Sequence, residues 1–359
     1  SSRATILGIT GSAGKTSLKN LIFQLLQTYG PALCSPKSYN NHYGVPLSLS
    51  NLNFNHKYGI FEVGMSRKGE INKLSKLIKP HIAIITNIGE AHIENFKNLK
   101  GIAKAKSEII TNIKKGGTLI LNHDDAYYRY LKDKADRSKI KVVTFGFSKK
   151  SQIYPVMIAK NKKNTKLKIK VNNQILKLVI KNINIYNVLS SIALLNELNL
   201  DLNKIIKNFK NFEPTEGRGK IHSIKRYKKN FKLIDESYNA NPLSVKNAIK
   251  NFNNIKKNKF KKYLILGDML ELGDKSEALH KDLSKVINNS DIDKVFIKGN
   301  KTLVTYKNIN KNKRGNIFQL EEDVDFTLNN IIANNDYLMI KGSNATGLNN
   351  FSKRMIKGL

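Results

Sequence analysis

One segment near the start of the chain combines the residue types and the spacing of a phosphate-binding loop. It consists of Gly11, Ser12, Ala13, Gly14, Lys15 and Thr16. It follows an apolar run at residues 5–9 and opens an amphipathic run at residues 15–29. Glycines let the backbone wrap phosphates, and the amide groups at the start of a helix face negative charge. Lys15 supplies a mobile cation and the Thr16 hydroxyl can bind Mg²⁺, so the segment predicts a nucleoside triphosphate site.

The first position of this loop departs from the general phosphate-loop motif. In the pattern G-x-x-x-x-G-K-[ST], the first glycine would fall on position 9, which is Ile9. A glycine-rich turn between a strand and a helix, with an ordinary lysine, is therefore the alternative. The apolar strand before the loop and the helix after it favour phosphate binding, because the motif requires both flanks.

Two more residues that could do chemistry follow apolar runs elsewhere in the chain. Glu62 comes at the end of the run 58–63, and His92 follows the run 82–86. The carboxyl ends of parallel strands converge on one ligand crevice, so both side chains are expected near the phosphate loop. A carboxylate and an imidazole could help to hold Mg²⁺ on the nucleotide. Taken alone, Glu62 also fits a helix cap, and His92 also fits a structural side chain.

These side chains can meet only if the chain forms a parallel sheet, and the alternation of strand-like and helix-like runs predicts one. Strands are expected at residues 5–9, 58–63, 82–86 and 118–121, and helices at 15–29, 70–78 and 99–113. From residue 152 to 180 the pattern changes to short alternating segments, which predict a small β-rich appendage. We therefore expect an α/β central domain like that of phosphate-loop NTPases, with a mostly parallel sheet.

A second α/β domain is expected after helices at residues 185–198 and 202–209. The Pro- and Gly-containing stretch 213–219 is typical of a domain junction. Beyond it, strands are predicted at residues 231–234, 263–266, 294–297 and 337–340, with helices at 242–252, 276–287, 321–333 and 348–356. The sequence thus predicts a central domain over residues 1–219 and a Rossmann-like domain over residues 220–359.

The bulk composition excludes some classes of protein and leaves one alternative open. The formal net charge of +36 would suit a nucleic-acid-binding protein. However, Lys, Asn and Ile are all frequent, as in an A/T-rich coding sequence, and the lysines are spread along the chain. The single cysteine, Cys34, excludes an internal disulfide. No apolar run approaches the roughly 20 residues of a membrane helix, and no leader is visible, so we expect a cytoplasmic protein.

Several longer motifs resemble those of the Mur ligase family, from about Ile6 to the C-terminus. The loop form T-G-S-A-G-K-T is seen in these ligases and in the related folylpolyglutamate synthetases. The segments that resemble the ligases that add D-alanyl-D-alanine are 38–48, 61–71, 87–92, 235–242 and 267–280. The block D-E-S-Y-N-A-N-P at 235–242 is the most specific of them. A strand followed by a turn explains its last two residues but not the whole block.

The resemblance implies roles for residues of the first domain. Glu62, His92 and Thr16 would hold Mg²⁺, and Asn40 and Asn41 would lie on the substrate side. Lys106 lies in A-K-A-K-S-E, which is similar to the family segment whose lysine is carbamylated in many Mur ligases. The resemblance implies that the modified Lys106, now an anion, would bridge or orient the metal site together with Thr16, Glu62 and His92. In a chain so rich in lysine, the alternative for Lys106 is a solvated helix face.

The resemblance also implies roles for residues around and beyond the domain junction. Asn187, Arg218, Asp235, Tyr238 and Asn239 would contact the nucleotide, and Asn241, His280 and Lys341 would contact the substrate. Two positions depart from the family pattern. Tyr186 stands at the usual histidine before Asn187, and Asn344 stands where many members carry arginine after K-G-S.

As a Mur-type ligase, the chain is expected to use ATP and Mg²⁺ to join D-alanyl-D-alanine to UDP-N-acetylmuramoyl-tripeptide. The tripeptide carboxylate would be phosphorylated by ATP and then attacked by the amine, with Lys15, His92 and carbamylated Lys106 as catalytic residues. We expect a monomer that binds no nucleic acid and enters no membrane. Family members also carry an N-terminal domain that grips the UDP end; we expect this chain to lack it and to bind UDP-sugars weakly.

Two alternatives remain open at this point. The first is another Mur-type or folylpolyglutamate-synthetase-like amide ligase, which would differ in the amine that it accepts. The second is a noncatalytic basic module that binds ATP or nucleic acid, for which salt-sensitive DNA binding would be diagnostic.

Overall fold

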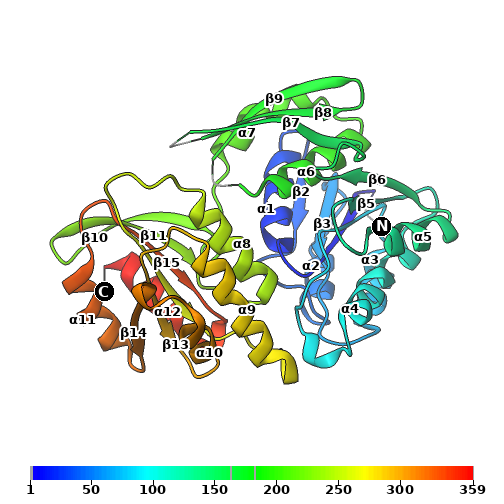
Figure 1. Cartoon of the computed structure of the whole chain (residues 1–359). Helices are drawn as coiled ribbons and strands as arrows, with labels where there is room; N and C mark the ends of the chain where they lie inside the picture. The colour runs from blue at the N-terminus through cyan, green and yellow to red at the C-terminus, as the bar shows by residue number, and fades with distance from the viewer. Residues whose placement is uncertain (1–2, 162–163, 182, 359) are drawn as a thin grey trace. The chain divides into compact units, whose positions relative to one another are not determined.

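Two separate sheets organise the chain in the computed structural model, which describes residues 3–161, 164–181 and 183–358 (Figure 1). Contacts between Cα atoms divide the chain into two units. The first unit comprises Ser1–Gly89 and Asn95–Phe212, and the second comprises Glu90–Glu94 and Glu213–Leu359. The stretch 213–219 therefore belongs to the second unit.

The first unit contains a nine-stranded sheet in the order β2-β3-β1-β4-β5-β6-β7-β8-β9. Its strands are β1 (Thr5–Thr10), β2 (Ala32–Cys34), β3 (Tyr58–Glu62), β4 (Ile82–Ile85), β5 (Thr118–Asn122), β6 (Lys141–Phe145), β7 (Ile153–Lys160), β8 (Thr165–Val171) and β9 (Gln174–Ile180). Its α-helices are α1 (Lys15–Leu26), α2 (Gly44–Ser50), α3 (Glu70–Ile78), α4 (Leu99–Lys106), α5 (Tyr128–Arg137), α6 (Ile185–Glu197) and α7 (Ile206–Asn211).

Helices cover both faces of this sheet because its central strands are apolar on both sides. On one face, Leu7 and Ile9 of β1 pack in a core with the buried side of α1 and with α6. On the other face, Gly8 of β1 lies against Ile78 of α3 and Ile109. The buried side of α1 contains Leu18, Leu21, Ile22 and Leu25, which follow the spacing of one helical face.

The register of the central strands fixes the edge of the sheet at which a site can form. Ile9 of β1 is level with Glu62 of β3 and with Ile84 of β4. The carboxyl ends of these three parallel strands therefore lie together, next to the loop that leads from β1 into α1. This arrangement agrees with the sequence-based expectation for Glu62.

The predicted β-rich appendage continues the same sheet. β7, β8 and β9 form an antiparallel series, and β7 joins the parallel strands by one pair, Phe145 with Ile153 (Figure 1). The predicted helix at 99–113 is wrong in one respect: α4 ends at Lys106, and a 3₁₀ helix, η2, covers Ser107–Asn112. Here the Ser107 hydroxyl donates to the Lys104 carbonyl oxygen, a local bond that competes with regular helix geometry.

The second unit contains a six-stranded sheet in the order β10-β11-β15-β12-β13-β14. Its strands are β10 (Lys220–Arg226), β11 (Lys229–Glu236), β12 (Lys262–Gly267), β13 (Lys294–Lys298), β14 (Arg314–Phe318) and β15 (Tyr337–Lys341). Its α-helices are α8 (Pro242–Asn253), α9 (Ser276–Asn288), α10 (Thr302–Asn308), α11 (Glu321–Ile331) and α12 (Leu348–Lys357). Only β10 is antiparallel to its neighbour. The predicted α/β architecture of two mostly parallel sheets is confirmed.

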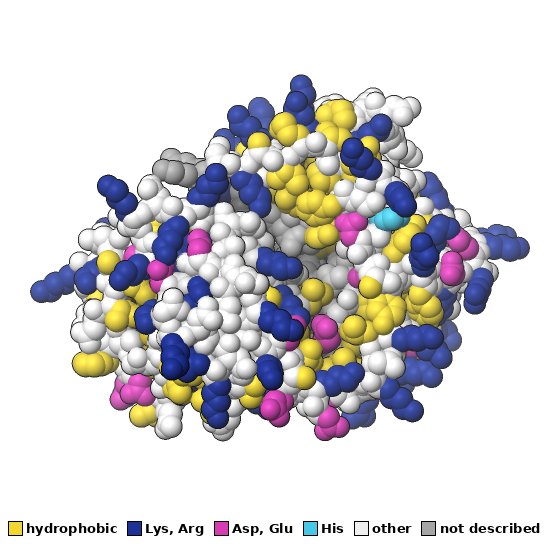
Figure 2. All heavy atoms as spheres, viewed as in Figure 1, with side chains coloured by type: hydrophobic (Ala, Val, Ile, Leu, Met, Phe, Trp, Pro, Cys, Tyr) yellow, Lys and Arg dark blue, Asp and Glu magenta, His cyan; other side chains and the backbone are white. Residues whose placement is uncertain are grey.

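Charged side chains are dispersed over the face of the molecule that Figure 2 shows. Figure 2 shows Lys and Arg side chains scattered among uncharged and hydrophobic ones on the visible face. Within the described residues, no helix combines the length and the apolar character that crossing a membrane requires.

Candidate active site

The phosphate-type loop joins β1 to α1 in a backbone conformation that needs glycine at two positions. Gly11 has φ of 145° and Gly14 has φ of 82°, values that side chains rarely adopt. A Cβ atom on Gly11 would also lie 1.9 Å from Thr86 Oγ1. The close approach of the backbone to the neighbouring strand end therefore explains why Gly11 carries no side chain.

Residues that follow β4 hold this loop in place, and the sequence analysis gave them no role of their own. Asn87 Oδ1 accepts a hydrogen bond of 2.8 Å from the Ala13 amide, and Thr86 Oγ1 donates to the Ala13 carbonyl oxygen at 2.7 Å. The Ser12 amide donates to the Asn87 carbonyl oxygen at 3.0 Å. The Ser12 hydroxyl lies 2.9 Å from the Gly89 carbonyl oxygen. These contacts preorganise the loop amides.

Next to the loop, a hydroxyl and a carboxylate form the pair that a magnesium site needs. Thr16 Oγ1 donates to Glu62 Oε2 at 2.7 Å, and Asn40 Nδ2 donates to Glu62 Oε1 at 2.7 Å. The Ser38 hydroxyl lies 3.3 Å from Thr16 Oγ1. Glu62 is 1% exposed. Hard oxygen ligands of this kind suit Mg²⁺, so the residues fit the ion that the sequence predicts.

Two lysines converge on the first glycine of the loop. Lys15 Nζ donates to the Gly11 carbonyl oxygen at 2.8 Å, and Lys106 Nζ donates to the same oxygen at 3.0 Å. Lys106 is buried at the end of α4. Burial, and secondarily the charge of Lys15, holds the pKa of Lys106 well below its ordinary value. The alternative of a solvated helix face is therefore wrong for Lys106.

A third lysine, which the sequence analysis did not single out, fixes the entry to the Asn40 segment. Lys19 of α1 is fully buried, and its Nζ donates to the carbonyl oxygens of Ser35 and Lys37, each at 2.5 Å. Its charge thus ties α1 to the turn that leads to Asn40. In the sequence, only the place of Lys19 one helical turn after Lys15 could have suggested that it lies near the loop.

Asn187 and Asn41 differ in how closely the structure links them to the loop. A Cβ atom on Gly14 would lie 3.4 Å from Asn187 Oδ1, so the Asn187 side chain faces the loop from α6. Asn41 Oδ1 instead accepts from the amides of Gly44, at 2.9 Å, and Tyr43, at 3.2 Å. Asn41 therefore shapes the start of α2.

In the second unit, a cluster forms where β10 begins and β11 ends. Asp235 is buried, and its carboxylate accepts from the Gly217 amide at 2.7 Å and from the Ser237 hydroxyl at 2.5 Å. The Arg218 guanidinium lies 4.2 Å from the centre of the Tyr238 ring, within range of a cation–π contact. The structure thus brings together three of the residues predicted for the nucleotide.

Lys341 and Asn239 extend this cluster at the carboxyl end of β15. Lys341 Nζ donates to the Asn239 carbonyl oxygen at 2.6 Å and lies 3.4 Å from Glu236 Oε2. Burial lowers the pKa of Lys341, whereas the nearby charge of Glu236 raises it. The nearby carboxylate offsets part of the cost of burying the ammonium.

Two residues predicted for the substrate make internal hydrogen bonds. Asn241 is the N-cap of α8, where its side chain accepts from the Ser244 amide at 2.8 Å within a capping box. His280 has no exposed surface; its Nε2 accepts from the Met269 amide at 3.1 Å, and its Nδ1 lies 2.7 Å from the Ser276 carbonyl oxygen. Both ring nitrogens are therefore occupied, which supports a positioning role.

His92 belongs to the short Glu90–Glu94 segment that groups with the second unit. Its Nδ1 lies 2.5 Å from Glu271 Oε2, and this contact lowers the pKa of Glu271 against the opposing effect of burial. His92 also has a φ of 58°, which is uncommon for a residue other than glycine. Its predicted partnership with Glu62 stays a prediction.

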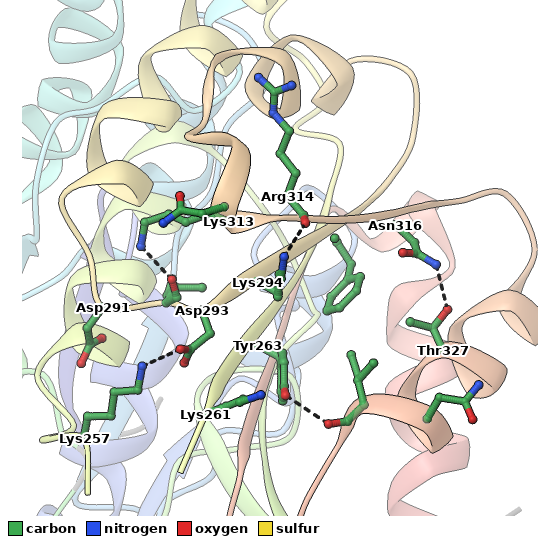
Figure 3. A pocket seen from close by; sticks show the side chains of 16 residues that line it. Lys257, Lys261, Tyr263, Asp291, Asp293, Lys294, Lys313, Arg314, Asn316 and Thr327 are labelled. Atoms are coloured by element: carbon green, nitrogen blue, oxygen red, sulfur yellow. Dashed lines mark hydrogen bonds and ion pairs between the residues drawn. The ribbon is translucent and has the colours of Figure 1, made fainter. Parts of the chain in front are cut away.

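The second unit also contains a cavity of about 830 Å³ at the opposite edge of its sheet (Figure 3). Tyr263, Lys294 and Arg314, which line it, stand at the amino ends of β12, β13 and β14. Ligands of open α/β sheets bind at the carboxyl ends, where Asp235 and Lys341 lie. This cavity is therefore separate from the cluster described above.

Comparison with known proteins places both units. Residues 9–195 match the Mur ligase middle domain, and residues 219–344 match the Mur ligase, glutamate ligase domain. The UDP-N-acetylmuramoyl-tripeptide--D-alanyl-D-alanine ligase of Buchnera aphidicola subsp. Baizongia pistaciae is 33% identical over 99% of this chain and 76% of its own length. The ligase of the same name from Rickettsia prowazekii is 31% identical, over 97% of this chain and 77% of its own length.

Solved structures share the fold. MurF from Acinetobacter baumannii aligns with a TM-score of 0.88 at 24% identity, covering 99% of this chain and 77% of that one. MurF ligase from Thermotoga maritima, solved in complex with ADP, aligns with a TM-score of 0.87 at 23% identity, covering 99% and 80%. Since the two domain matches span most of the sequence and curated relatives exceed 30% identity, the chain belongs to the Mur ligase family.

Proposed function

We propose that this chain is an ATP-dependent ligase that joins D-alanyl-D-alanine to UDP-N-acetylmuramoyl-tripeptide. The observation that carries the proposal is that Lys15, Thr16, Glu62 and Lys106 gather around the loop after β1. Two relatives named for this reaction align over 99% and 97% of the chain, which supports the choice of acceptor and amine.

The reaction couples ATP cleavage to amide formation through an acyl phosphate. The tripeptide carboxylate attacks the γ-phosphorus of ATP, and ADP leaves. The free amine of D-alanyl-D-alanine then attacks the acyl carbon, phosphate leaves, and the amine loses a proton. Lys15 and the loop amides stabilise the negative charge that develops on the transferred phosphoryl group.

Thr16 and Glu62 would hold Mg²⁺ in this proposal, with His92 as a further ligand. When bound, Mg²⁺ neutralises charge on the ATP phosphates. Asn40 orients the Glu62 carboxylate through its 2.7 Å hydrogen bond, and such supporting contacts tune metal affinity.

Lys106 is proposed to react with CO₂ to form a carbamate. The neutral amine attacks the carbon of CO₂, and one proton is released, so an uncharged group becomes an anion. Burial favours this step, because it lowers the pKa of Lys106 and so makes the neutral amine easier to reach. Incubation with ¹³C-bicarbonate should give a carbamate signal in the NMR spectrum that is absent from Lys106→Met; identical spectra would contradict carbamylation.

The second unit contributes the other binding residues. Arg218, Asp235, Tyr238 and Asn239 are assigned to the nucleotide. Arginine suits phosphate or ribose oxygens because its planar fork offers two parallel donors.

The substrate side is assigned to Asn40, Asn41, Asn241, His280 and Lys341. The internal bonds of Asn41, Asn241 and His280 support an indirect role, in which these residues shape the segments that touch the substrate.

ADP release in the presence of ATP, Mg²⁺ and UDP-N-acetylmuramoyl-tripeptide tests the proposal. Turnover should require D-alanyl-D-alanine and should not be supported by glutamate. Turnover with glutamate alone would favour another amide ligase. Salt-sensitive DNA binding without amine-dependent turnover would favour a noncatalytic module. In Lys15→Ala, the affinity for ATP should fall at least about tenfold, since a charge-assisted phosphate contact is lost.

A further inference from the structure

His222 in β10 carries a buried ring nitrogen that faces a carboxylate without forming a hydrogen bond. Its Nε2 is buried and makes no hydrogen bond to any described residue, although it lies only 3.2 Å from Glu216 Oε2. Buried polar atoms in native proteins are nearly always hydrogen-bonded, so the exception needs a cause. A cation bound between this nitrogen and the Glu216 carboxylate would give both of them a partner.

A third ligand lies beside this pair. One ligand atom each from Glu216, His222 and Asp235 lies within 4.8 Å of the other two. In the β10–β11 ladder, Asp235 pairs with Lys220, and His222 stands two residues further along on the same face of β10. The Gly217 amide and the Ser237 hydroxyl fix the Asp235 carboxylate. The half-exposed Glu216 side chain can move toward the other two ligand atoms and complete the group of three.

We propose that Glu216, His222 and Asp235 form a binding site for a transition-metal ion such as Zn²⁺ or Co²⁺. One imidazole nitrogen and two carboxylate oxygens suit these borderline ions, whereas Mg²⁺ prefers oxygen ligands throughout. The site therefore differs in chemistry from the Thr16–Glu62 pair. Three protein ligands leave at least one coordination position for water.

Lys220 competes with the ion for Glu216. Its Nζ donates to Glu216 Oε1 at 3.0 Å and places a positive charge next to the ligands. Removing this ammonium should release Glu216 and reduce the electrostatic repulsion of a divalent cation. The variant Lys220→Met should consequently bind the metal more tightly than the native chain.

Occupancy of this site also regulates the nucleotide site, an inference that rests on the proposed function of Asp235. An ion that takes the Asp235 carboxylate withdraws it from the nucleotide. Zn²⁺ should therefore weaken ATP binding at concentrations that fill the site.

Calorimetric titration of the full chain with Zn²⁺, in a non-chelating buffer without nucleotide, tests the site. His222→Ala and Glu216→Gln should each weaken binding at least about tenfold, the usual cost of losing a group that supports a metal site. Lys220→Met should tighten it, and the control His56→Ala, whose Nδ1 only accepts from the Asn53 amide, should bind like the native chain. Because Cys34 is present in every variant, any binding at this thiol cancels in the comparison.

Equal Zn²⁺ affinity in the native chain, His222→Ala and Glu216→Gln would overturn the site. If His222→Ala fails to fold by circular dichroism, the surface variants Glu216→Gln and Lys220→Met decide the question alone. The spectrum of bound Co²⁺ gives an independent readout, since its visible bands should weaken in Glu216→Gln at equal metal concentration.

The regulatory step has its own test. ATP affinity is measured with and without saturating Zn²⁺ in the native chain and in His222→Ala, so that chelation of Zn²⁺ by ATP is equal in both. A loss of affinity confined to the native chain is expected, and equal responses would overturn regulation. Failure to bind ATP without Zn²⁺ would instead count against the proposed function.

Discussion

The two units each bury a lysine, but they satisfy its charge differently. Lys262 in the second unit is fully buried, and its Nζ donates to both oxygens of Asp291 at 2.7 and 2.8 Å and to the Phe252 carbonyl oxygen at 2.9 Å. Lys106 in the first unit is equally buried, yet its only acceptor among the described residues is the Gly11 carbonyl oxygen. No carboxylate among them reaches its ammonium within 4.0 Å.

This difference separates a structural lysine from one held for chemistry. A buried charge is stable only when a partner compensates for lost hydration, as Asp291 does for Lys262. Lys106 lacks such a partner, and the charge of Lys15 makes its protonated form less stable still. The unfavourable environment shifts Lys106 toward its neutral, nucleophilic form. Lys262 instead ties the end of α8 to its sheet.

The largest effect should come from replacing Lys106 with methionine, which preserves volume and removes the amine. Activity should fall by about 10²- to 10³-fold, because the carbamate anion that would orient Mg²⁺ at the transferred phosphoryl group is lost. Small carboxylates such as formate, added at high concentration, should restore part of the activity by supplying an anion in place of the carbamate. ADP release with and without formate measures both effects.

The same variant should not unfold more easily, because the Gly11 carbonyl oxygen still accepts from Lys15. The pKa of Lys106 is 10.5 in the unfolded chain and lower in the folded chain. Below pH 10.5, the unfolded chain therefore binds a proton more readily at this lysine than the folded chain does. Native stability should therefore rise as pH increases toward 10.5, and Lys106→Met should lack this rise. Urea unfolding in CO₂-free buffer measures the stability of the native chain and of Lys106→Met as a function of pH. Parallel profiles would contradict the contrast drawn between Lys106 and Lys262.

Glu62→Gln should give the next largest effect and shows whether the first unit's site is a metal site at all. The amide keeps the shape and one acceptor for Thr16 but removes the negative charge that favours Mg²⁺. The Mg²⁺ concentration for half-maximal activity should increase at least about tenfold. The control is Glu70→Gln, which changes a carboxylate bound to the Ser66 and Arg67 amides and should leave the Mg²⁺ requirement unaltered.

Much of the first unit's site could be predicted from sequence, because its parts are local. The loop from Gly11 to Thr16 is recognisable from one strand, a few glycines and one helix, and Glu62 follows from the rule that parallel strand ends converge. The hydrogen bonds that hold the loop against the residues after β4 could not be predicted from the sequence. Asn87 binds the Ala13 amide across 74 positions of sequence, a contact that exists only once β1 and β4 are paired.

Burial was equally inaccessible from the sequence. Lys and Arg together number 63, and no local pattern distinguishes Lys106, Lys19 or Lys262 from the solvated lysines. The family motif selected Lys106 but also selected His280 and Asn241, whose side chains turn out to be engaged in hydrogen bonds within the second unit. A motif records that a residue type is needed, whereas only the fold distinguishes direct contact from support.

Replacing Lys262 with methionine should affect stability and leave the chemistry unchanged. The Phe252 carbonyl oxygen near the end of α8 loses its buried donor, while Asp291, one-third exposed, can be rehydrated. We expect unfolding to become easier by about 1–3 kcal/mol, the usual cost of an unsatisfied buried group. Denaturant unfolding measures this, and ADP release per folded molecule should match the native chain. A loss of turnover without a loss of stability would reverse the roles assigned to the two lysines.

The smallest effect concerns another base of the first unit that lacks an acidic partner. His81 Nδ1 accepts from the Ile6 amide at 2.8 Å, and its Nε2 lies 2.9 Å from Lys114 Nζ, so protonation brings two positive charges together. Burial first, and Lys114 second, lower the pKa of His81 from its ordinary 6.5. Its contribution to stability is therefore complete above 6.5 and is lost as the pH falls toward the folded pKa.

His81→Asn keeps an acceptor for the Ile6 amide and cannot titrate in this range. Between about pH 7 and 5, native stability should consequently fall more steeply than that of the variant. Urea unfolding across these pH values, followed by hydrogen exchange of amides in β1 and β4, reports on the first unit directly. Equal slopes of stability against pH in the native chain and in His81→Asn would mean that the acid sensitivity of the first unit does not arise from His81. The lack of an acidic partner would then distinguish the first unit at Lys106 alone.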